Sequence, residues 1–331
     1  MAPLKIGTLG AARITPTALI KPARKVPEVV VTAVAARDPE RARAFAAKHG
    51  IPKVHASYED LVGDPEIDAV YIPLPNSAHA EWAIKALDAG KHVLCEKPFT
   101  SNAAEAQQVA DVAAKSGLVV MEAFHYRYHP MADRMKHVVD SGVLGQIRHI
   151  ETAMCIVLPF KNDIRYRYDL AGGATMDVGC YAIHQLRLLA GAEPEVVGAS
   201  AKLARPNVDR WMRADFRFAD GRTGRMTCAL WSARLFKLSA RVSGTDGELR
   251  VVNPTGPQYY NRLKVRAETR TTRERVRGDA TYVYQLQAFA AGVLEGQPVL
   301  TGPADAVANM RVIDDVYRAA GLPVRGAAVG D

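Results

Sequence analysis

Short apolar runs alternate with stretches of helical periodicity along roughly the first 120 residues. The apolar runs are Leu4–Leu9, Val29–Ala35, Ala69–Pro73, His92–Cys95 and Val119–Ala123. The helical stretches are Pro39–His49, Tyr58–Gly63, His79–Ala89 and Asn102–Ser116. Nearly continuous apolar strands are typical of a parallel sheet that is buried on both faces. The alternation therefore predicts an α/β region with a doubly wound sheet.

After Phe124 the pattern changes to an alternation with a period of two. In residues 210–218 the side chains of Met212, Ala214 and Phe216 fall on one face, while charged residues occupy the other. Such strands predict an open, mainly antiparallel sheet with one apolar face.

Two domains are expected from this change of pattern. Residues 1–124 are predicted to form a dinucleotide-binding Rossmann domain. Residues 125–331 are predicted to form an α+β domain for substrate binding and oligomerisation, and its C-terminal helix is expected to pack back on the first domain. Helical periodicity in Tyr282–Leu294 and Pro303–Ala320 marks the last two helices.

The composition is that of an ordinary globular protein, with 331 residues, 48% hydrophobic and 24% charged. No apolar run reaches the ~20 residues of a membrane helix, and the four cysteines form no C-x-x-C pair, so we expect a soluble cytoplasmic protein without a membrane partner. The net charge of +8 is spread along the chain except at Arg262–Arg277. This stretch alternates with polar residues, which favours a solvated hairpin over a polyanion site, and nucleic-acid binding is not expected.

A degraded phosphate-binding fingerprint follows the first predicted strand. The segment reads Gly10-Ala11-Ala12-Arg13-Ile14-Thr15, in which only the first glycine of G-x-G-x-x-G is retained. Because backbone amides and a helix N-terminus meet a pyrophosphate at this position of the fold, we take residues 10–14 as cofactor-binding candidates. The alternative is an ordinary tight turn.

The end of the second predicted strand indicates which dinucleotide is bound. An enzyme that uses NAD usually places a carboxylate there for the ribose 2′-hydroxyl, but this strand ends in Ala35-Ala36-Arg37-Asp38. Arg37 can pair with a 2′-phosphate through its guanidinium, which favours NADP. The alternative is that Asp38, one residue later, reaches the ribose of NAD.

Four segments carry a more specific pattern. They are Leu74-Pro75-Asn76 with His79, Cys95-Glu96-Lys97-Pro98, Glu122-Ala123-Phe124 with Tyr126–Pro130, and Gly172–Tyr181 with His184. Together they resemble the glucose-fructose oxidoreductase / inositol dehydrogenase (Gfo/Idh/MocA) family. The crossover segment and Tyr181 resemble the branch of dihydrodiol and xylose dehydrogenases, because inositol dehydrogenases have histidine at the position of Tyr181. His125 departs from the usual apolar residue and leaves the substrate open.

The resemblance implies roles for several of these residues in binding the cofactor. It implies a nicotinamide-side loop that contains Leu74, Pro75, Asn76 and His79. It also implies that Lys97 hydrogen-bonds the substrate hydroxyl or the nicotinamide ribose, that Glu96 fixes this lysine, and that the bond to Pro98 is cis. Arg127, in the crossover, either touches the cofactor or braces the domain junction.

The chemistry of alcohol oxidation needs a group that takes the hydroxyl proton while the hydride leaves carbon. Tyr181 is the candidate acid/base. Tyrosine ordinarily has a pKa of about 10, so a nearby cation is required, and Lys97 is the candidate. Asp177, Tyr181 and His184 have i, i+4 and i+7 spacing, which would place them on one helix face; we assign Asp177 to orienting substrate or Lys97, and His184 to binding substrate.

Structural alternatives exist for each of these three residues. Tyr181 and His184 are also compatible with a buried core, and Asp177 with a helix N-cap. His125 and His129 have i, i+4 spacing, but no third ligand is evident and we expect no metal.

The leading functional hypothesis is an NADP-dependent oxidoreductase that acts on a sugar, polyol or cyclic diol. One alternative is an isomerase, hydrolase or lyase whose cofactor is recycled internally. Another is a dinucleotide-binding sensor, although a sensor needs no acid/base group. The family resemblance further implies a homodimer or homotetramer formed through the open sheet of the second domain.

Overall fold

The chain folds into two compact units. The computed structural model describes residues 2–160, 162–231, 236–268 and 270–326. Unit 1 contains residues 1–128 and 280–307, and unit 2 contains residues 129–279 and 308–331.

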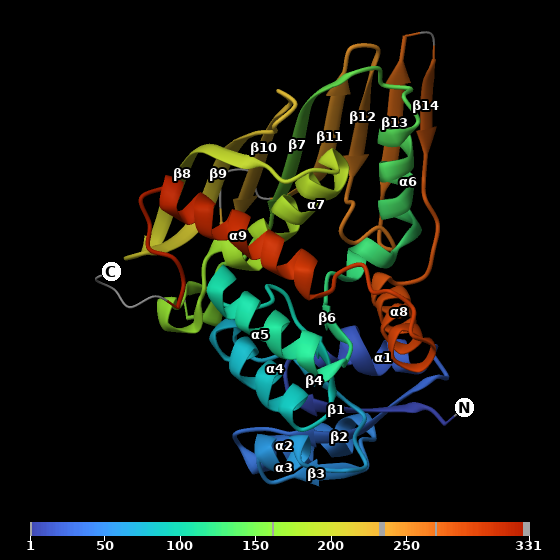
Figure 1. The fold of residues 1–331 in the computed structure, drawn as a ribbon, viewed down its shortest axis with the longest axis vertical. Helices are drawn as coiled ribbons and strands as arrows, with labels where there is room; N and C mark the ends of the chain where they lie inside the picture. Colours follow the sequence, from blue (N-terminus) through green and yellow to red (C-terminus); the bar gives the residue numbers. More distant parts are fainter. Residues whose placement is uncertain (1, 161, 232–235, 269, 327–331) are drawn as a thin grey trace. The chain divides into compact units, whose positions relative to one another are not determined.

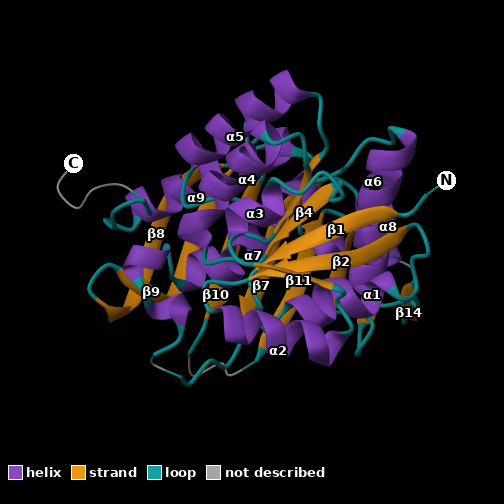
Figure 2. Cartoon of the chain, turned by 90° about the horizontal axis from the view of Figure 1, so that it is seen from below, coloured by secondary structure: helices purple, strands orange, loops and turns teal. Residues whose placement is uncertain are grey.

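Unit 1 is built on a six-stranded parallel sheet with the order β3-β2-β1-β4-β5-β6. Its strands are β1 (Leu4–Leu9), β2 (Val29–Ala35), β3 (Lys53–His55), β4 (Ala69–Ile72), β5 (His92–Cys95) and β6 (Val120–Glu122). Figure 2 shows β1, β2 and β4 side by side. The order reverses between β1 and β4, and ligands of doubly wound folds bind outside the carboxyl ends of the strands at such a point.

Helices cover the sheet of unit 1. They are the π-helix η1 (Pro16–Ile20), α1 (Lys21–Ala23), α2 (Pro39–His49), α3 (Tyr58–Val62), η2 (Asn76–Ala78), α4 (His79–Asp88), α5 (Ala103–Ser116), η3 (His125–Tyr128) and α8 (Thr281–Glu295). Leu286 and Phe289 of α8 pack in one core with Ile6 of β1 and Leu94 of β5, and Figure 1 shows α8 beside α1. Burying such a side chain stabilises the fold by about 1.5–3 kcal/mol.

The predicted elements of the first region are confirmed, and some short ones were missed. The observed bounds of β1, β2, β5 and α2 coincide with the predicted ranges. The helical segment Pro16–Ala23 and the strand β3 were not predicted. The first is too short to show a helical period, and the second is a three-residue edge strand with exposed or half-buried side chains.

Unit 2 contains an eight-stranded sheet with the order β14-β13-β12-β11-β7-β10-β9-β8. Its strands are β7 (Ile147–Cys155), β8 (Glu195–Arg205), β9 (Val208–Arg217), β10 (Thr223–Ala229), β11 (Lys237–Gly244), β12 (Gly247–Val252), β13 (Arg262–Ala267) and β14 (Thr271–Glu274). Among the described strands, β7 and β10 run parallel and the other neighbours run antiparallel. The predicted open, mainly antiparallel sheet is therefore confirmed.

One face of this sheet is covered by a buried helix. The helices of unit 2 are α6 (Pro130–Asp140), η4 (Ile164–Tyr166), η5 (Tyr168–Leu170), the π-helix η6 (Thr175–Gly179), α7 (Cys180–Ala190) and most of α9 (Pro303–Ala319). Thr152 of β7 donates its hydroxyl to the Ala182 carbonyl of α7 at 2.8 Å. Met212, Ala214 and Phe216 are buried, as the alternation predicted.

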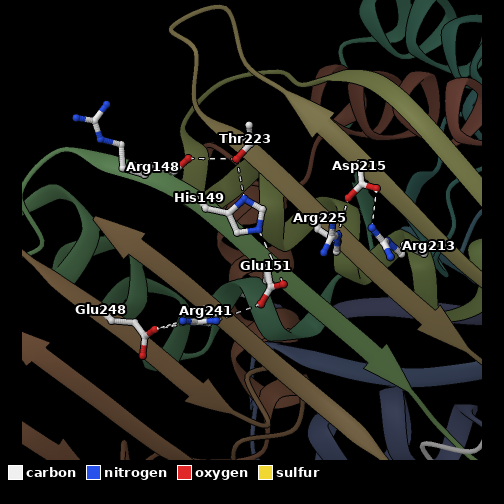
Figure 3. Close-up of polar contacts among 9 residues, drawn as sticks. All are labelled: Arg148, His149, Glu151, Arg213, Asp215, Thr223, Arg225, Arg241 and Glu248. Carbon is white, nitrogen blue, oxygen red and sulfur yellow. Dashed lines mark hydrogen bonds and ion pairs between the residues drawn. The ribbon is translucent and has the colours of Figure 1, made fainter. Parts of the chain in front are cut away.

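The opposite face carries charged side chains, as Figure 3 shows. Arg225 donates to Asp215 at 2.5 Å, and Arg241 donates to Glu248 at 2.6 Å. Burial would raise the pKa of Asp215, but its hydrogen bonds with Arg225 and Arg213 hold that pKa below the ordinary value. These arginines and carboxylates are therefore paired within the chain.

The arginine-rich stretch contains the expected hairpin, because β13 and β14 pair antiparallel. Residue 269, which falls between these two strands in the sequence, lies outside the described residues. Within the described ranges, no helix combines the length and the apolar character needed to cross a membrane.

Asp64 of unit 1 ties the edge strand β3 to the loop after α3. Its carboxylate lies 2.6 Å from Lys53 Nζ and 3.0 Å from His55 Nε2, and it accepts a hydrogen bond from the Glu66 amide. The hydrogen bond from Lys53, followed by that from the Glu66 amide, lowers the pKa of Asp64 from 3.8 to about 2.

We predict that Asp64→Asn destabilises the protein only where this carboxylate is ionised. Because the folded pKa lies below the unfolded value of 3.8, the stabilisation is fully present above that pH and disappears as pH falls through about 2. Thermal unfolding at pH 6 should show a lower Tm for the variant, and the difference should shrink between pH 4 and pH 2. Asp88→Asn, at the exposed end of α4, is the control. A Tm difference that is independent of pH would contradict the assignment.

Candidate active site

The predicted phosphate loop joins β1 to the helical segment that begins at Pro16. Gly10 has a φ of +98°, and a Cβ there would lie 3.3 Å from Leu74 Cδ2. Its amide donates to the Ala35 carbonyl of β2. The positive φ explains why the first glycine of the fingerprint is retained. Ala12, Arg13 and Ile14 are half-buried or exposed, so solvent can reach this loop.

Two arginines and a tyrosine gather at the end of β2. Arg37 is exposed, and Arg41 donates from Nη2 to the Ala11 carbonyl of the phosphate loop at 2.8 Å. Burial raises the pKa of the Tyr58 hydroxyl, and the charges of Arg37 and Arg41 oppose this rise. Asp38 is the N-cap of α2 and accepts from the amides of Glu40 and Arg41. The carboxylate of Asp38, the first one after β2 in the sequence, is thus already bonded to backbone amides of α2.

Arg41 and Tyr58 were missed in the sequence. Arg41 follows Arg37 by four residues, which is the signal that could have found it. Tyr58 comes from α3, and nothing in the local pattern links it to β2.

The loops after β4 and β5 are tied together by His79. One ring nitrogen lies 2.8 Å from the Pro98 carbonyl, and the other lies 2.9 Å from the Leu74 carbonyl. Burial lowers the pKa of His79, and the hydrogen bonds to the Pro98 and Leu74 carbonyls oppose this lowering. Pro75 and Asn76 are half-buried in the same loop. His79 therefore fixes the nicotinamide-side loop against the segment that carries Lys97.

Glu96 and Lys97 follow the carboxyl end of β5. Tyr71 donates its hydroxyl to Glu96 Oε1 at 2.7 Å, and the Lys97 amide donates to Glu96 Oε2 at 3.3 Å. The Lys97–Pro98 peptide bond is cis, as the resemblance implied. Lys97 is half-buried, and Glu96 holds its backbone. Arg127 is half-buried in η3 of the same unit.

The substrate-side residues lie in unit 2 on a segment that is not a uniform α-helix. Residues 175–179 form a π-helix, and α7 continues from Cys180. Asp177 lies in the π-helix, whereas Tyr181 and His184 are buried in α7 at 4% and 3% exposure. The wider π-turn interrupts the regular i, i+4, i+7 register, and such turns are frequent at functional sites. The N-cap is Ala174, so the alternative of Asp177 as a cap is not observed.

Asp177 is paired with an arginine that sequence analysis missed. Its Oδ1 lies 3.0 Å from Nε of Arg165, which also pairs with Asp163 at 3.1 Å. The charge of Asp177 is the largest factor that raises the pKa of Arg165 above its ordinary value. The carboxylate of Asp177 is thus held in a fixed direction by a half-exposed cation.

The predicted residues therefore fall into two groups. The loops at residues 10–14, 37, 74–79, 96–97 and 127 belong to unit 1, while Asp177, Tyr181 and His184 belong to unit 2. Within the described residues, no group of three or more His, Cys, Asp or Glu side chains is arranged to hold a metal ion. His125 instead contacts Thr281 at 2.7 Å, and His129 accepts from the Met131 amide.

Comparison with known proteins assigns both regions of the chain. Residues 4–124 match the model described as "Oxidoreductase family, NAD-binding Rossmann fold", and residues 132–250 match the GFO/IDH/MocA C-terminal domain. The chain belongs to the GFO/IDH/MocA oxidoreductase family. The resemblance and the fold predicted from the sequence are thereby confirmed.

Members of the GFO/IDH/MocA family match this chain over most of its length. A D-xylose 1-dehydrogenase (NADP(+)) of Haloferax volcanii is 37% identical over 98% of this chain and 99% of its own. A trans-1,2-dihydrobenzene-1,2-diol dehydrogenase of Bos taurus is 35% identical over 68% of this chain and 66% of its own. The crystal structure of a 3-ketoreductase from Actinomadura kijaniata, in complex with NADP and TDP-benzene, superposes with a TM-score of 0.88, 29% identity and coverage of 96% and 98%.

These relatives are dehydrogenases and reductases. The present chain is accordingly an NAD(P)-dependent oxidoreductase that acts on CH–OH groups, and its residues 4–124 match the NAD-binding Rossmann fold of the family.

Proposed function

We propose that this protein is an NADP-dependent dehydrogenase that oxidises a hydroxyl, or reduces the matching carbonyl, of a sugar, polyol or cyclic diol. The match to the xylose dehydrogenase over nearly the whole of both chains is the observation that carries this substrate class. The diol dehydrogenase and the 3-ketoreductase are consistent with a broader class of hydroxyl or carbonyl substrates.

The preference for NADP rests on the basic cluster at the end of β2. Arg37 and Arg41 are the cations that would face a 2′-phosphate, and Tyr58 supplies a hydroxyl beside them. Asp38 is engaged as a helix cap and is thereby less suited to bind the ribose of NAD. The loop at residues 10–14 is proposed to receive the pyrophosphate on its backbone amides.

The proposed reaction divides the work between the two units. Bound NADP supplies the redox half by accepting a hydride from the carbinol carbon. The ammonium of Lys97 would stabilise the phenolate form of Tyr181. This phenolate takes the hydroxyl proton as the carbonyl forms and becomes a neutral phenol. Asp177, fixed by Arg165, orients the substrate, and His184 binds another hydroxyl. Leu74, Pro75, Asn76, His79, Glu96 and Arg127 complete the cofactor side.

The open charged face of the sheet in unit 2 is proposed to pair with the same face of a second copy, which gives a homodimer or homotetramer. In a symmetric dimer the same face of both copies meets. Arginines and carboxylates alternate on this face, so the arginines of one copy can lie against carboxylates of the other. We also assign the protein to the cytoplasm, since its four cysteines are buried and no disulfide joins them.

Arg37→Ala should raise the KM for NADPH about 10- to 100-fold, because charge-assisted hydrogen bonds to the 2′-phosphate are lost. The KM for NADH should remain near the wild-type value. Arg43→Ala, at an exposed arginine of α2 that pairs with Glu40, is the matched control. Equal effects of Arg37→Ala on both dinucleotides would refute the NADP assignment.

Tyr181→Phe should lower kcat about 100- to 10,000-fold, because the proton acceptor is removed. The assay is absorbance at the nicotinamide band with NADP and a panel of sugars, polyols and diols that begins with D-xylose. Fluorescence titration should show unchanged NADPH binding. Tyr166→Phe, which removes a buried hydroxyl that donates to the Leu158 carbonyl, should retain turnover. NADPH binding without turnover of any panel member by the wild type would instead favour a sensor or an internally recycled cofactor.

Charge reversal on the open sheet face should dissociate the oligomer. Arg241→Glu places a third carboxylate beside Glu151 and Glu248, and light scattering should show the mass falling to the 35.9 kDa of one chain. Arg318→Glu reverses another exposed, paired arginine of unit 2 and should leave the mass unchanged. A wild-type protein that is monomeric at micromolar concentration would disprove this assembly.

A further inference from the structure

Arg325, which follows α9, is a fully buried cation of unit 2. Its exposure is 0%, and its guanidinium donates to the carbonyls of Gly172 and Pro323 at 2.8 and 3.0 Å and to Asp209 Oδ1 at 3.1 Å. The guanidinium also lies 4.0 Å from the ring centroid of Tyr317. Because an isolated buried charge is strongly unfavourable, this arrangement requires all of these partners together.

Asp209 connects this cation to the first turn of the substrate-side helix. Its exposure is also 0%, and its Oδ2 accepts from the amide and the hydroxyl of Thr175, both at 2.7 Å. Tyr317 donates its hydroxyl to the other carboxylate oxygen at 3.0 Å. Ala174, the N-cap of the π-helix, provides no side-chain cap, so Asp209 performs that function from β9.

The two glycines before the helix show how closely this network surrounds the backbone. Gly173 has a φ of +142°, and a Cβ there would lie 2.2 Å from Asp209 Oδ1 and 3.0 Å from Arg325 Nη2. A Cβ on Gly172 would lie 2.7 Å from the carbonyl of Arg165, the residue that pairs with Asp177. The backbone is therefore enclosed by the ion pair on one side and by the loop of Arg165 on the other.

We propose that Arg325 and Asp209 form a buried positioning pair that fixes the start of the π-helix, and with it the placement of Asp177 and Tyr181. The pair holds Gly172 and Thr175, which lie within a few residues of Asp177 on the same continuous segment. This inference rests on the proposed role of Tyr181. A buried ion pair by itself is weak evidence for stability, since apolar residues of similar volume often serve as well. A need to fix the position of the π-helix explains the charged pair better than a contribution to stability does.

The test compares Arg325→Met with Arg187→Met. Arg187 is a second buried arginine, in the last turn of α7, where it donates twice to Glu193 at 2.7 Å. Both variants should have a lower Tm. At a temperature where both are folded, Arg325→Met should lower kcat about 100-fold, because a displacement of ~1 Å at a reacting group has that effect. NADPH affinity, measured by fluorescence titration, should stay near wild type.

Two further variants keep the inference testable if Arg325→Met does not fold. Arg325→Lys retains the charge beside Asp209 and should recover part of kcat. Thr175→Val removes the hydroxyl donor but keeps the side-chain shape, and it should lower kcat with unchanged NADPH affinity. Equal kcat in Arg325→Met and Arg187→Met, or wild-type kcat in Thr175→Val, would overturn the positioning role.

The same assay separates this inference from the proposed function. If Tyr181→Phe keeps wild-type turnover, the acid/base assignment fails and the positioning role falls with it. If Tyr181→Phe is inactive and Arg325→Met keeps wild-type kcat, only the positioning role fails.

Discussion

Burial of the parallel sheet on both faces is the constraint on which unit 1 depends. Because helices cover both faces, polar chemistry can be placed only where the strands end. Gly10 follows β1, Arg37 follows β2, Leu74 follows β4 and Lys97 follows β5. The candidate cofactor residues therefore gather at one edge through chain topology, although they are distant in sequence. His79 and Glu96 then fix the loops that topology has brought to this edge.

The sheet of unit 2 differs from that of unit 1, because only one of its faces is buried. Its sheet buries one face under α7, so this helix is surrounded by protein and its side chains are held firmly. A tyrosine in such a helix has little freedom to adjust its position, and the geometry of the preceding turn then sets where its hydroxyl lies. The other face of the sheet can carry charge, and on it Arg225 pairs with Asp215 and Arg241 with Glu248.

The fold was largely predictable because periodicity reports burial directly. The ends of β1, β2, β5 and α2 were predicted to the residue, while Pro16–Ala23 and β3 are too short to show a period. The π-helix was not predictable, since the same residues fit a regular helix equally well. Arg37 was found because it lies two residues after the end of a strand. Tyr58, Arg165 and Arg325 were missed because their partners come from other elements; Arg325 and Asp209 are 116 positions apart.

The closeness of Gly173 to Asp209 and Arg325 has a consequence for how this sequence can vary. A larger residue at 173 would collide with the carboxylate of Asp209. Loss of this carboxylate would leave the guanidinium of Arg325 buried without its counter-ion, and loss of the guanidinium would do the same to the carboxylate. The effect of a substitution at one of these three positions should consequently depend strongly on which residues occupy the other two. Replacements that keep the fold must therefore change these positions together. This part of unit 2 should accept fewer single substitutions during evolution than the exposed face of the sheet does.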